Sequence, residues 1–213
     1  MSLEFLTLDA PAVARSPMER QARAAGARFE VRDGWNVAVD YGAPEREREI
    51  CRTAAGWADV SHLAKLELQG DHGLAGVTRR GGAWWCPVSD RRALVLGARG
   101  SMPGPDETEP EARVHVVEVT SNFAALTLIG PLAREVVARF CALDLRPQAT
   151  PVGSLRPGSV ARQPGMVLRE GEHRFMLLFG WAIGEYMWTV VQDAATHLGG
   201  GPVGQSALEG ADA

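Results

Sequence analysis

Three residues near position 60 have the types that a hydrolytic triad uses: Asp59, Ser61 and His62. A nucleophile and its base must be able to hydrogen-bond to each other. The surrounding segment reads as a strand, in which successive residues point to opposite faces, so Ser61 and His62 cannot pair directly. The chain also has no G-x-S-x-G elbow. We therefore expect a turn in which Asp59 or Ser61 bonds the backbone, and we assign no catalytic residue here.

Metal and phosphate sites are not indicated by the sequence. The five histidines show neither H-x-x-x-H nor H-x-H spacing. Asp71 and His72 are adjacent, but an acidic helix start beside an exposed histidine explains both. Gly70 and Gly130 each follow a strand-like run, and one glycine without a following lysine does not make a phosphate loop. We expect no metal ion to be bound.

The tryptophans are better candidates for a ligand wall. The six are Trp35, Trp57, Trp84, Trp85, Trp181 and Trp188. Large aromatic side chains are core residues first, so for any one of them a structural role is favoured over a ligand role.

Composition narrows the class of protein. A net charge of −4 with scattered arginines gives no basic patch for nucleic acid. The three cysteines lie far apart without C-x-x-C spacing, which indicates free thiols in a reducing compartment. The first 15 residues lack the pattern of a secretory signal, and no apolar run approaches the ~20 residues of a membrane span. We expect a cytoplasmic protein that binds neither nucleic acid nor membrane.

The elements that would position a site are organised around residues 123–140. This segment predicts a strand, a break at Gly130 and an amphipathic helix that begins at Pro131. Residues 63–77 match residues 123–137 at a constant offset, with identities that include Gly70 and Gly130. Two such strand–glycine–helix units could pack into one pseudo-symmetric core, although leucine and alanine also match by coincidence.

The whole chain is expected to form an α+β fold with mostly antiparallel sheets, because short strands follow one another as hairpins between helices. We predict an N-terminal arm over residues 1–15, one domain over residues 16–198 and a flexible tail over residues 199–213. Residues 71–78 are predicted as a short helix and residues 98–113 as a mobile loop. Residues 115–119 and 123–129 are predicted to pair as a hairpin.

Residues 34–70 carry a family resemblance. Their pattern, GW-x4-VDYG followed by AAGWADVSHLAKLELQG, resembles the glycine-cleavage T protein, the tetrahydrofolate-dependent aminomethyltransferase. The segment FAALTLIGPLAREVV is similar to the family's LQGP-x-A-x-x-V strand and helix. The resemblance covers roughly residues 16–209. It implies a T-protein-like folate-binding domain, with tetrahydrofolate as its cofactor.

The sequence departs from the family at the positions that the resemblance links to chemistry. T proteins carry their catalytic Asp on a hairpin with a GG-x-x-DD pattern, and this hairpin is expected to be deleted between Val77 and Ala83. Met176 stands where the family has a folate-binding Glu, and a thioether is at best a weak hydrogen-bond acceptor. The family's C-terminal barrel domain is also expected to be missing.

These departures resemble a second branch of the superfamily, the gamma subunit of heterotetrameric sarcosine oxidase, most closely over residues 123–193. The resemblance implies a module without catalytic residues, with flavoprotein partner subunits or other copies of itself as partners. An aminomethyltransferase-like protein that binds tetrahydrofolate remains an alternative, as does a structural protein on the same fold. The resemblance places a folate-like pocket at Leu63, Trp84, Trp85 and Met176.

Overall fold

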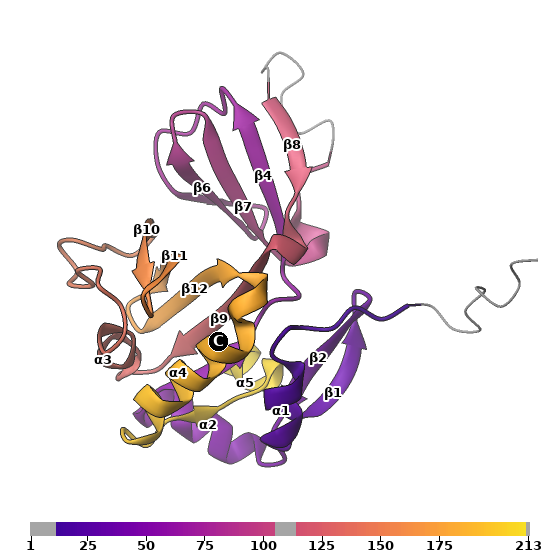
Figure 1. Cartoon of the computed structure of the whole chain (residues 1–213), viewed down its shortest axis with the longest axis vertical. Helices are drawn as coiled ribbons and strands as arrows, with labels where there is room; N and C mark the ends of the chain where they lie inside the picture. Colours follow the sequence, from indigo (N-terminus) through magenta and orange to yellow (C-terminus); the bar gives the residue numbers. More distant parts are fainter. Residues whose placement is uncertain (1–11, 105–113, 212–213) are drawn as a thin grey trace, which may run out of the picture.

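The computed structural model describes residues 12–104 and 114–211. Its strands form a two-stranded hairpin, a six-stranded sheet and a five-stranded sheet, called here the central and the upper sheet (Figure 1). The hairpin is β1 (Arg28–Arg32) and β2 (Trp35–Asp40). The central sheet has the order β10 (Ser154–Val160), β11 (Gln163–Gly171), β12 (Arg174–Gly180), β9 (Phe123–Ile129), β3 (Gly56–Asp59) and β13 (Gly201–Pro202). The upper sheet has the order β5 (Thr78–Arg80), β6 (Ala83–Ser89), β7 (Arg92–Gly97), β4 (Ala64–Gly70) and β8 (Val114–Glu118).

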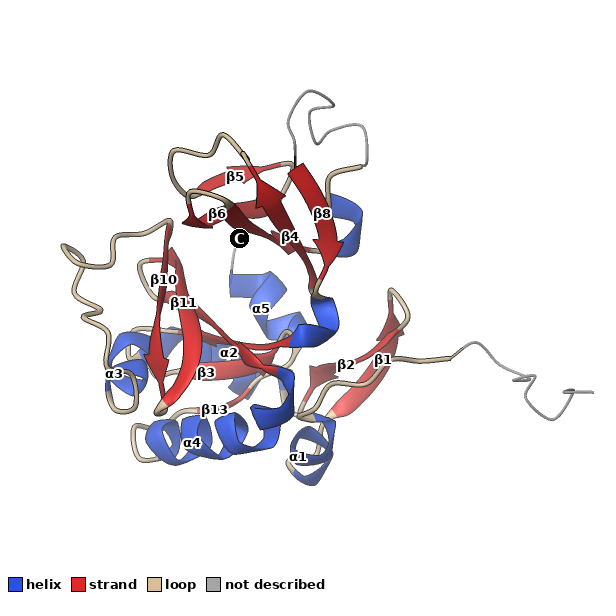
Figure 2. Cartoon of the chain, turned by 45° about the horizontal axis from the view of Figure 1, so that its top comes forward, coloured by secondary structure: helices blue, strands red, loops and turns tan. Residues whose placement is uncertain are grey.

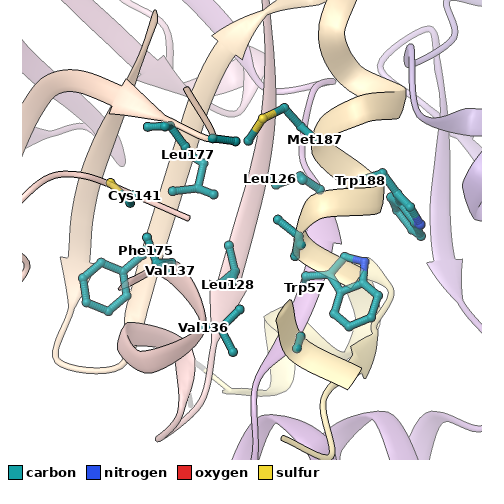
Figure 3. Packing of buried hydrophobic residues seen from close by; sticks show 14 of the residues in the cluster. Trp57, Leu126, Leu128, Val136, Val137, Cys141, Phe175, Leu177, Met187 and Trp188 are labelled. Carbon is teal, nitrogen blue, oxygen red and sulfur yellow. The ribbon is translucent and has the colours of Figure 1, made fainter. Parts of the chain in front are cut away.

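Helices cover both faces of the central sheet (Figure 2). They are α1 (Glu19–Ala24), α2 (Pro44–Thr53), α3 (Ala133–Ala138), α4 (Gly184–Thr196) and α5 (Gln205–Ala211). One face packs against α1, α3 and α4 through the helix-side core (Figure 3), which includes Trp57, Leu126, Leu128, Phe175, Leu177, Met187 and Trp188. The other face packs against α2, α5 and the upper sheet through the inter-sheet core, which includes Cys86, Leu94, Leu96, Ala125, Leu168, Met176 and Leu178. The predicted α+β fold with mostly antiparallel sheets is confirmed, and the described residues contain no closed barrel.

The predicted strand–glycine–helix unit is present as β9, Gly130 and α3. Strand β9 lies between β12 and β3, so both of its edges are paired. Leu126 and Leu128 point into the helix-side core, and Ala125 lies in the inter-sheet core. Gly130 has a φ of +123°, a backbone conformation that residues with a Cβ rarely adopt. Its earlier counterpart, Gly70, has a φ of +132° at the end of β4. The strand and glycine of the repeat therefore recur in the structure.

The helix predicted for residues 71–78 is wrong. Residues 71–77 are irregular, and β5 begins at Thr78. His72 makes local hydrogen bonds in place of a helix: its Nδ1 accepts from the Leu74 amide at 3.2 Å, and its Nε2 donates to the Ser89 carbonyl at 2.9 Å. Gly73, with a φ of +63°, and Gly76 further disfavour a helix here.

The hairpin predicted from residues 115–119 and 123–129 is also wrong. Strand β8 pairs with β4 in the upper sheet, whereas β9 pairs with β12 and β3 in the central sheet. The 3-10 turn Thr120–Asn122 carries the chain from one sheet to the other. Thr120 anchors this turn, because its Oγ1 accepts from the Lys65 amide at 3.0 Å.

The flexible tail predicted from residue 199 is corrected by β13 and α5. Strand β13 runs parallel to β3. Val203, Ala207 and Leu208 are buried in the inter-sheet core. Hydrophobic periodicity and composition did not predict structure in this segment, because its fold depends on packing against α2 and β2.

Two other sequence predictions fall partly outside the described residues. The N-terminal arm falls mostly on residues 1–11, outside the described residues, although Ala14 bridges to Trp35. The predicted loop at 98–113 is described only up to residue 104, where a 3-10 turn covers Arg99–Ser101. Among the described residues, no helix has the length and apolar character needed to cross a membrane.

Candidate functional site

The Asp59-Ser61-His62 segment forms a backbone turn. The Asp59 carboxylate accepts from the Ser61 amide at 3.0 Å, and Ser61 Oγ accepts from the Ala125 amide at 3.1 Å. These bonds fasten the end of β3 to β9, so the turn predicted from the sequence is confirmed. Burial raises the pKa of the Asp59 carboxyl, while hydrogen bonds from Ser16 and Ser61 oppose that shift. The segment therefore fastens two neighbouring strands of the central sheet.

Lys65 is a buried cation that sequence reasoning missed. It lies on β4 and is 1% exposed, and its Nζ donates to the carbonyls of Ser61 at 2.9 Å and Leu63 at 2.8 Å. Burial lowers its pKa to about 8. Lys65 alternates with Leu66 and Leu68 and lies on the face of β4 that the central sheet covers. Through these two hydrogen bonds Lys65 stabilises the turn that follows β3.

His62 gives this segment a pH dependence. Burial lowers its pKa to about 4, and the positive charge of Lys65 acts in the same direction. Between pH 6.5 and 4 the unfolded chain therefore binds a proton that the folded chain does not, so stability falls as pH falls through this window. Its contribution to the free energy of unfolding at pH 5 is expected to be about 2 kcal/mol lower than at pH 7.

Urea unfolding at pH 7 and pH 5 measures this loss. His62→Gln is expected to remove about 2 kcal/mol of the pH-dependent difference, because its amide does not titrate. His197→Gln, at an exposed position, is the matched control. An equal loss of stability in His62→Gln and in the unmodified chain would exclude His62 as the cause.

The structure brings together three of the four residues predicted to form a ligand pocket. Leu63, Trp84 and Met176 all pack in the inter-sheet core, from β4's leading turn, β6 and β12 respectively. Trp85 is on the opposite face of the upper sheet, where it packs with Leu68, Ala83 and Val95. Met176 is 3% exposed and pairs with Leu168 of β11. Only Leu63, Trp84 and Met176 can therefore act at one place between the sheets.

The hairpin predicted to be deleted is present. Thr78–Arg80 pairs with residues 83–85 around Gly81 and Gly82, whose φ values of +57° and +90° suit a two-residue hairpin turn. Counting GG-x-x-DD from these glycines places Trp85 and Cys86 at the two aspartate positions. The predicted deletion of the hairpin is therefore wrong. The two aspartates of the pattern are nevertheless replaced at those positions. Cys86 is fully buried, and burial raises the pKa of its thiol to about 12.

A cleft of about 670 Å³ opens beside the inter-sheet core. Its walls are α2, α5, the turn between β9 and α3, and the turn between β11 and β12. The lining residues are Arg48, Cys51, Arg52, Ile129, Gly130, Pro131, Glu170, Gly171, Glu172, His173, Arg174, Ala207 and Gly210. None of the four predicted ligand residues is among them.

Trp84 connects the predicted pocket to this cleft. Its indole N–H donates to one Glu170 carboxylate oxygen at 3.2 Å, and the other oxygen accepts from Arg174 at 3.2 Å. The Glu170 side chain is only 10% exposed, so a carboxylate stands close to the inter-sheet core although Met176 supplies none. Sequence reasoning missed both charged residues because they flank a turn and looked like solvent-facing hairpin residues.

The side chains that line the cleft include arginines and one buried thiol. Arg48 and Arg52 of α2 line the cleft and pair with Glu45 and Glu49 of the same helix. Burial raises the pKa of the Cys51 thiol to about 11, which leaves it protonated and unreactive. Among the described residues no group of three or more metal-ligating side chains occurs.

Comparison with known proteins places the fold. The family model described as the GCVT N-terminal domain matches residues 102–211. The aminomethyltransferase of Mycobacterium tuberculosis H37Rv is 26% identical over 241 residues, which cover 94% of this chain and 62% of the relative. That of Desulfitobacterium hafniense Y51 is 39% identical over 165 residues, or 62% of this chain and 44% of the relative. The chain spans under two thirds of the length of these relatives.

Two solved structures share the fold. One is the heterotetrameric sarcosine oxidase of Corynebacterium sp. U-96, with a TM-score of 0.64 at 19% identity over 87% of this chain and 96% of that chain. The other is the glycine cleavage aminomethyltransferase T of Bartonella henselae, with a TM-score of 0.68 at 15% identity over 92% of this chain and 60% of that chain. At these identities the likeness is one of fold.

Proposed function

Because the chain belongs to the GCVT N-terminal domain family, we propose that it is a non-catalytic module of that family. In this role it serves as a subunit of an oxidative demethylating complex of the sarcosine oxidase type. Flavoprotein partner subunits carry the redox chemistry of such a complex. The chain supplies a folded scaffold and a binding cleft.

The observation that carries this proposal is the chemistry at the GG-x-x-DD spacing. Trp85 and Cys86 hold the aspartate positions after Gly81 and Gly82. An indole is not a general acid, and the Cys86 thiol is fully buried with its pKa raised to about 12, so both are poor proton donors to a departing amine. General acid catalysis contributes typically ~10²–10⁴-fold to a rate, and that contribution has no source here. Met176 likewise supplies an apolar contact where the family pattern has a carboxylate. A retained fold with these replacements supports a role in assembly.

Recovery of the tagged chain from its native cells tests the proposal. We expect a flavoprotein to co-purify in a fixed ratio, read by flavin absorbance and by mass spectrometry of the eluate. The tag alone is the control. A chain that elutes as a monomer, without flavin or a second polypeptide, contradicts the proposal.

A second function, tetrahydrofolate binding, is favoured by one specific observation. The Trp84–Glu170 hydrogen bond places an aromatic ring and a carboxylate together beside a 670 Å³ cleft with three arginines. A pterin can stack on such a ring and donate to such a carboxylate, and arginines suit the carboxylates of its glutamate tail.

Calorimetry with tetrahydrofolate separates the two functions. The non-catalytic role alone predicts no heat of binding at about 1 mM ligand. Folate binding predicts heat that Trp84→Phe and Glu170→Gln each reduce, because each removes one partner of the hydrogen bond. Trp85→Phe is the matched control, because that ring lies on the other face of the upper sheet.

A further inference from the structure

Strand β8 is an edge strand of the upper sheet that lacks the usual protection against pairing. Among the described residues it pairs with β4 alone, and Figure 1 shows it at the border of the sheet. Natural proteins shorten such edges, insert bulges, or place proline or charged side chains along them. β8 has five residues, Val-His-Val-Val-Glu, in a continuous register with β4. Its one carboxylate, Glu118, is the last residue and pairs with Arg99 at 3.3 Å.

The other edge strands of the described structure show the protection that β8 lacks. β5 has only three residues, two of which are arginines. β10 contains Pro157, and β13 has two residues that include Pro202. β1 alternates charged residues and has a register shift at its start, and Ala14 bridges to β2. The missing protection is therefore particular to β8, which indicates that another strand covers this edge.

The hydrogen-bond pattern fixes which backbone groups of β8 point outward. Val119, the residue after the strand, donates its amide to the Lys65 carbonyl at 2.9 Å. In an antiparallel ladder every second residue bonds to the neighbouring strand, so the alternate residues before Val119 also bond to β4. The N–H and C=O groups of Val116, and of the residues two before and two after it, therefore point away from β4. They have no hydrogen-bond partner among the described residues.

The side chains of β8 suit a second copy of the same strand. Val116 and Val117 are 42% and 40% exposed, on opposite faces of the sheet. In an antiparallel pair centred on Val116, that residue lies opposite itself. Val117 then lies opposite His115 of the second copy, and Val114 opposite Glu118. Each polar side chain therefore faces a valine, no like charges lie opposite each other, and both exposed valines are covered.

We propose that β8 is a dimer interface, at which two copies of this chain pair antiparallel about Val116 and join their upper sheets. The pairing has the two-fold symmetry that a closed homodimer requires. A five-residue edge buries less than the ~800 Å² per partner of a standard interface, so we expect a weak dimer with a Kd of roughly 10–100 µM. The dimer does not depend on the proposed function, because it involves this chain alone.

Sedimentation velocity of the full chain at rising concentration tests this proposal. Val116→Lys places like charges opposite each other at the two-fold axis, so it is expected to weaken the dimer at least about tenfold, and Val116→Glu should do the same. An equal mixture of the two variants should associate again, because lysine on one copy then faces glutamate on the other. Val31→Lys is the matched control, because Val31 is 61% exposed on the edge strand β1 and should leave the dimer unchanged.

Several results would overturn the proposal. These are an unmodified chain that stays monomeric up to about 1 mM, a Val116→Lys variant that dimerises as well as the unmodified chain, or a mixture of the two variants that stays monomeric. A chain that is monomeric alone, and that loses a second polypeptide through Val116→Lys, would also overturn it, because another protein would then cover this edge. Should the variants fail to fold, hydrogen exchange decides: the Val116 amide of the unmodified chain must exchange more slowly as concentration rises.

Discussion

Replacing Gly130 with alanine is expected to prevent the chain from folding stably. A Cβ at this position would lie 2.4 Å from the Ala54 carbonyl oxygen and 2.8 Å from that of Cys51. Both atoms belong to the backbone at the end of α2, so no side-chain rotation relieves the contact. The approach is close because the Ala54 carbonyl accepts from the Leu132 amide at 3.0 Å, which joins α2 to the start of α3. The φ of +123° adds backbone strain for any residue with a Cβ.

The loss of stability in Gly130→Ala is expected to exceed roughly 4 kcal/mol, the range of exceptional single substitutions. Gly153→Ala is the matched control, because Gly153 also has a positive φ, of +75°, but a Cβ there meets nothing within 4 Å. Strain alone should cost that variant about 1–2 kcal/mol. Circular dichroism and urea unfolding of both variants measure the difference. Similar stabilities would show that α2 and α3 can move apart at little cost.

Gly130 also illustrates how far local pattern predicts this fold. The alternation before it and the helical spacing after it correctly predicted β9 and α3, because both elements bury one contiguous set of apolar residues. The same reasoning placed a helix after Gly70, where the pattern is similar but contains two more glycines. There His72 bonds to the Leu74 amide and to the Ser89 carbonyl, and no helix forms. A pattern of spacing alone does not distinguish these two outcomes.

Other errors arose where long-range contacts decide the structure. Residues 115–129 look like a hairpin locally, yet the turn at Thr120–Asn122 separates two sheets, because β4 and β12 pair with the two strands instead. The Gly81-Gly82 turn is local, and it was missed because β5 has only three residues.

In the candidate site too, local pattern predicts some features and long-range contacts decide the others. Leu63, Trp84 and Met176 share one core, because alternation along a strand fixes which face a residue occupies. Alternation also places Trp85 on the opposite face from Trp84, so these neighbours cannot share a pocket. Glu170 and Arg174 were not predictable. Their roles depend on which turns and helices pack against each other, and hydrophobic periodicity does not predict that packing.

Glu47 is the second residue whose replacement is expected to have a large effect. It is 3% exposed, although its neighbours Arg46 and Arg48 are charged. One carboxylate oxygen accepts from the Tyr41 amide at 2.7 Å and the other from the Gly204 amide at 2.8 Å. It therefore ties α2 to the end of β2 and to the loop that leads into α5.

Glu47→Ala is expected to lower the free energy of unfolding by roughly 3–5 kcal/mol, since two charge-assisted hydrogen bonds are lost and two buried N–H groups are left unpaired. Glu47→Gln keeps one acceptor oxygen and should lose about half as much. Glu45→Ala is the matched control, because Glu45 is in the same helix turn with an 86% exposed side chain, and its loss should stay within about 0.5 kcal/mol.

Hydrogen exchange shows which part of the chain the Glu47→Ala substitution loosens. In Glu47→Ala the Gly204 amide should exchange much faster, and the amides of α5 should follow, because Gly204 leads directly into that helix. The strands β11 and β12, which do not contact Glu47 through these bonds, should keep their protection until global unfolding. Uniformly faster exchange across the chain would mean that Glu47 supports the whole domain, and unchanged exchange at Gly204 would mean that the docking of α5 rests on Val203 and Leu208 alone.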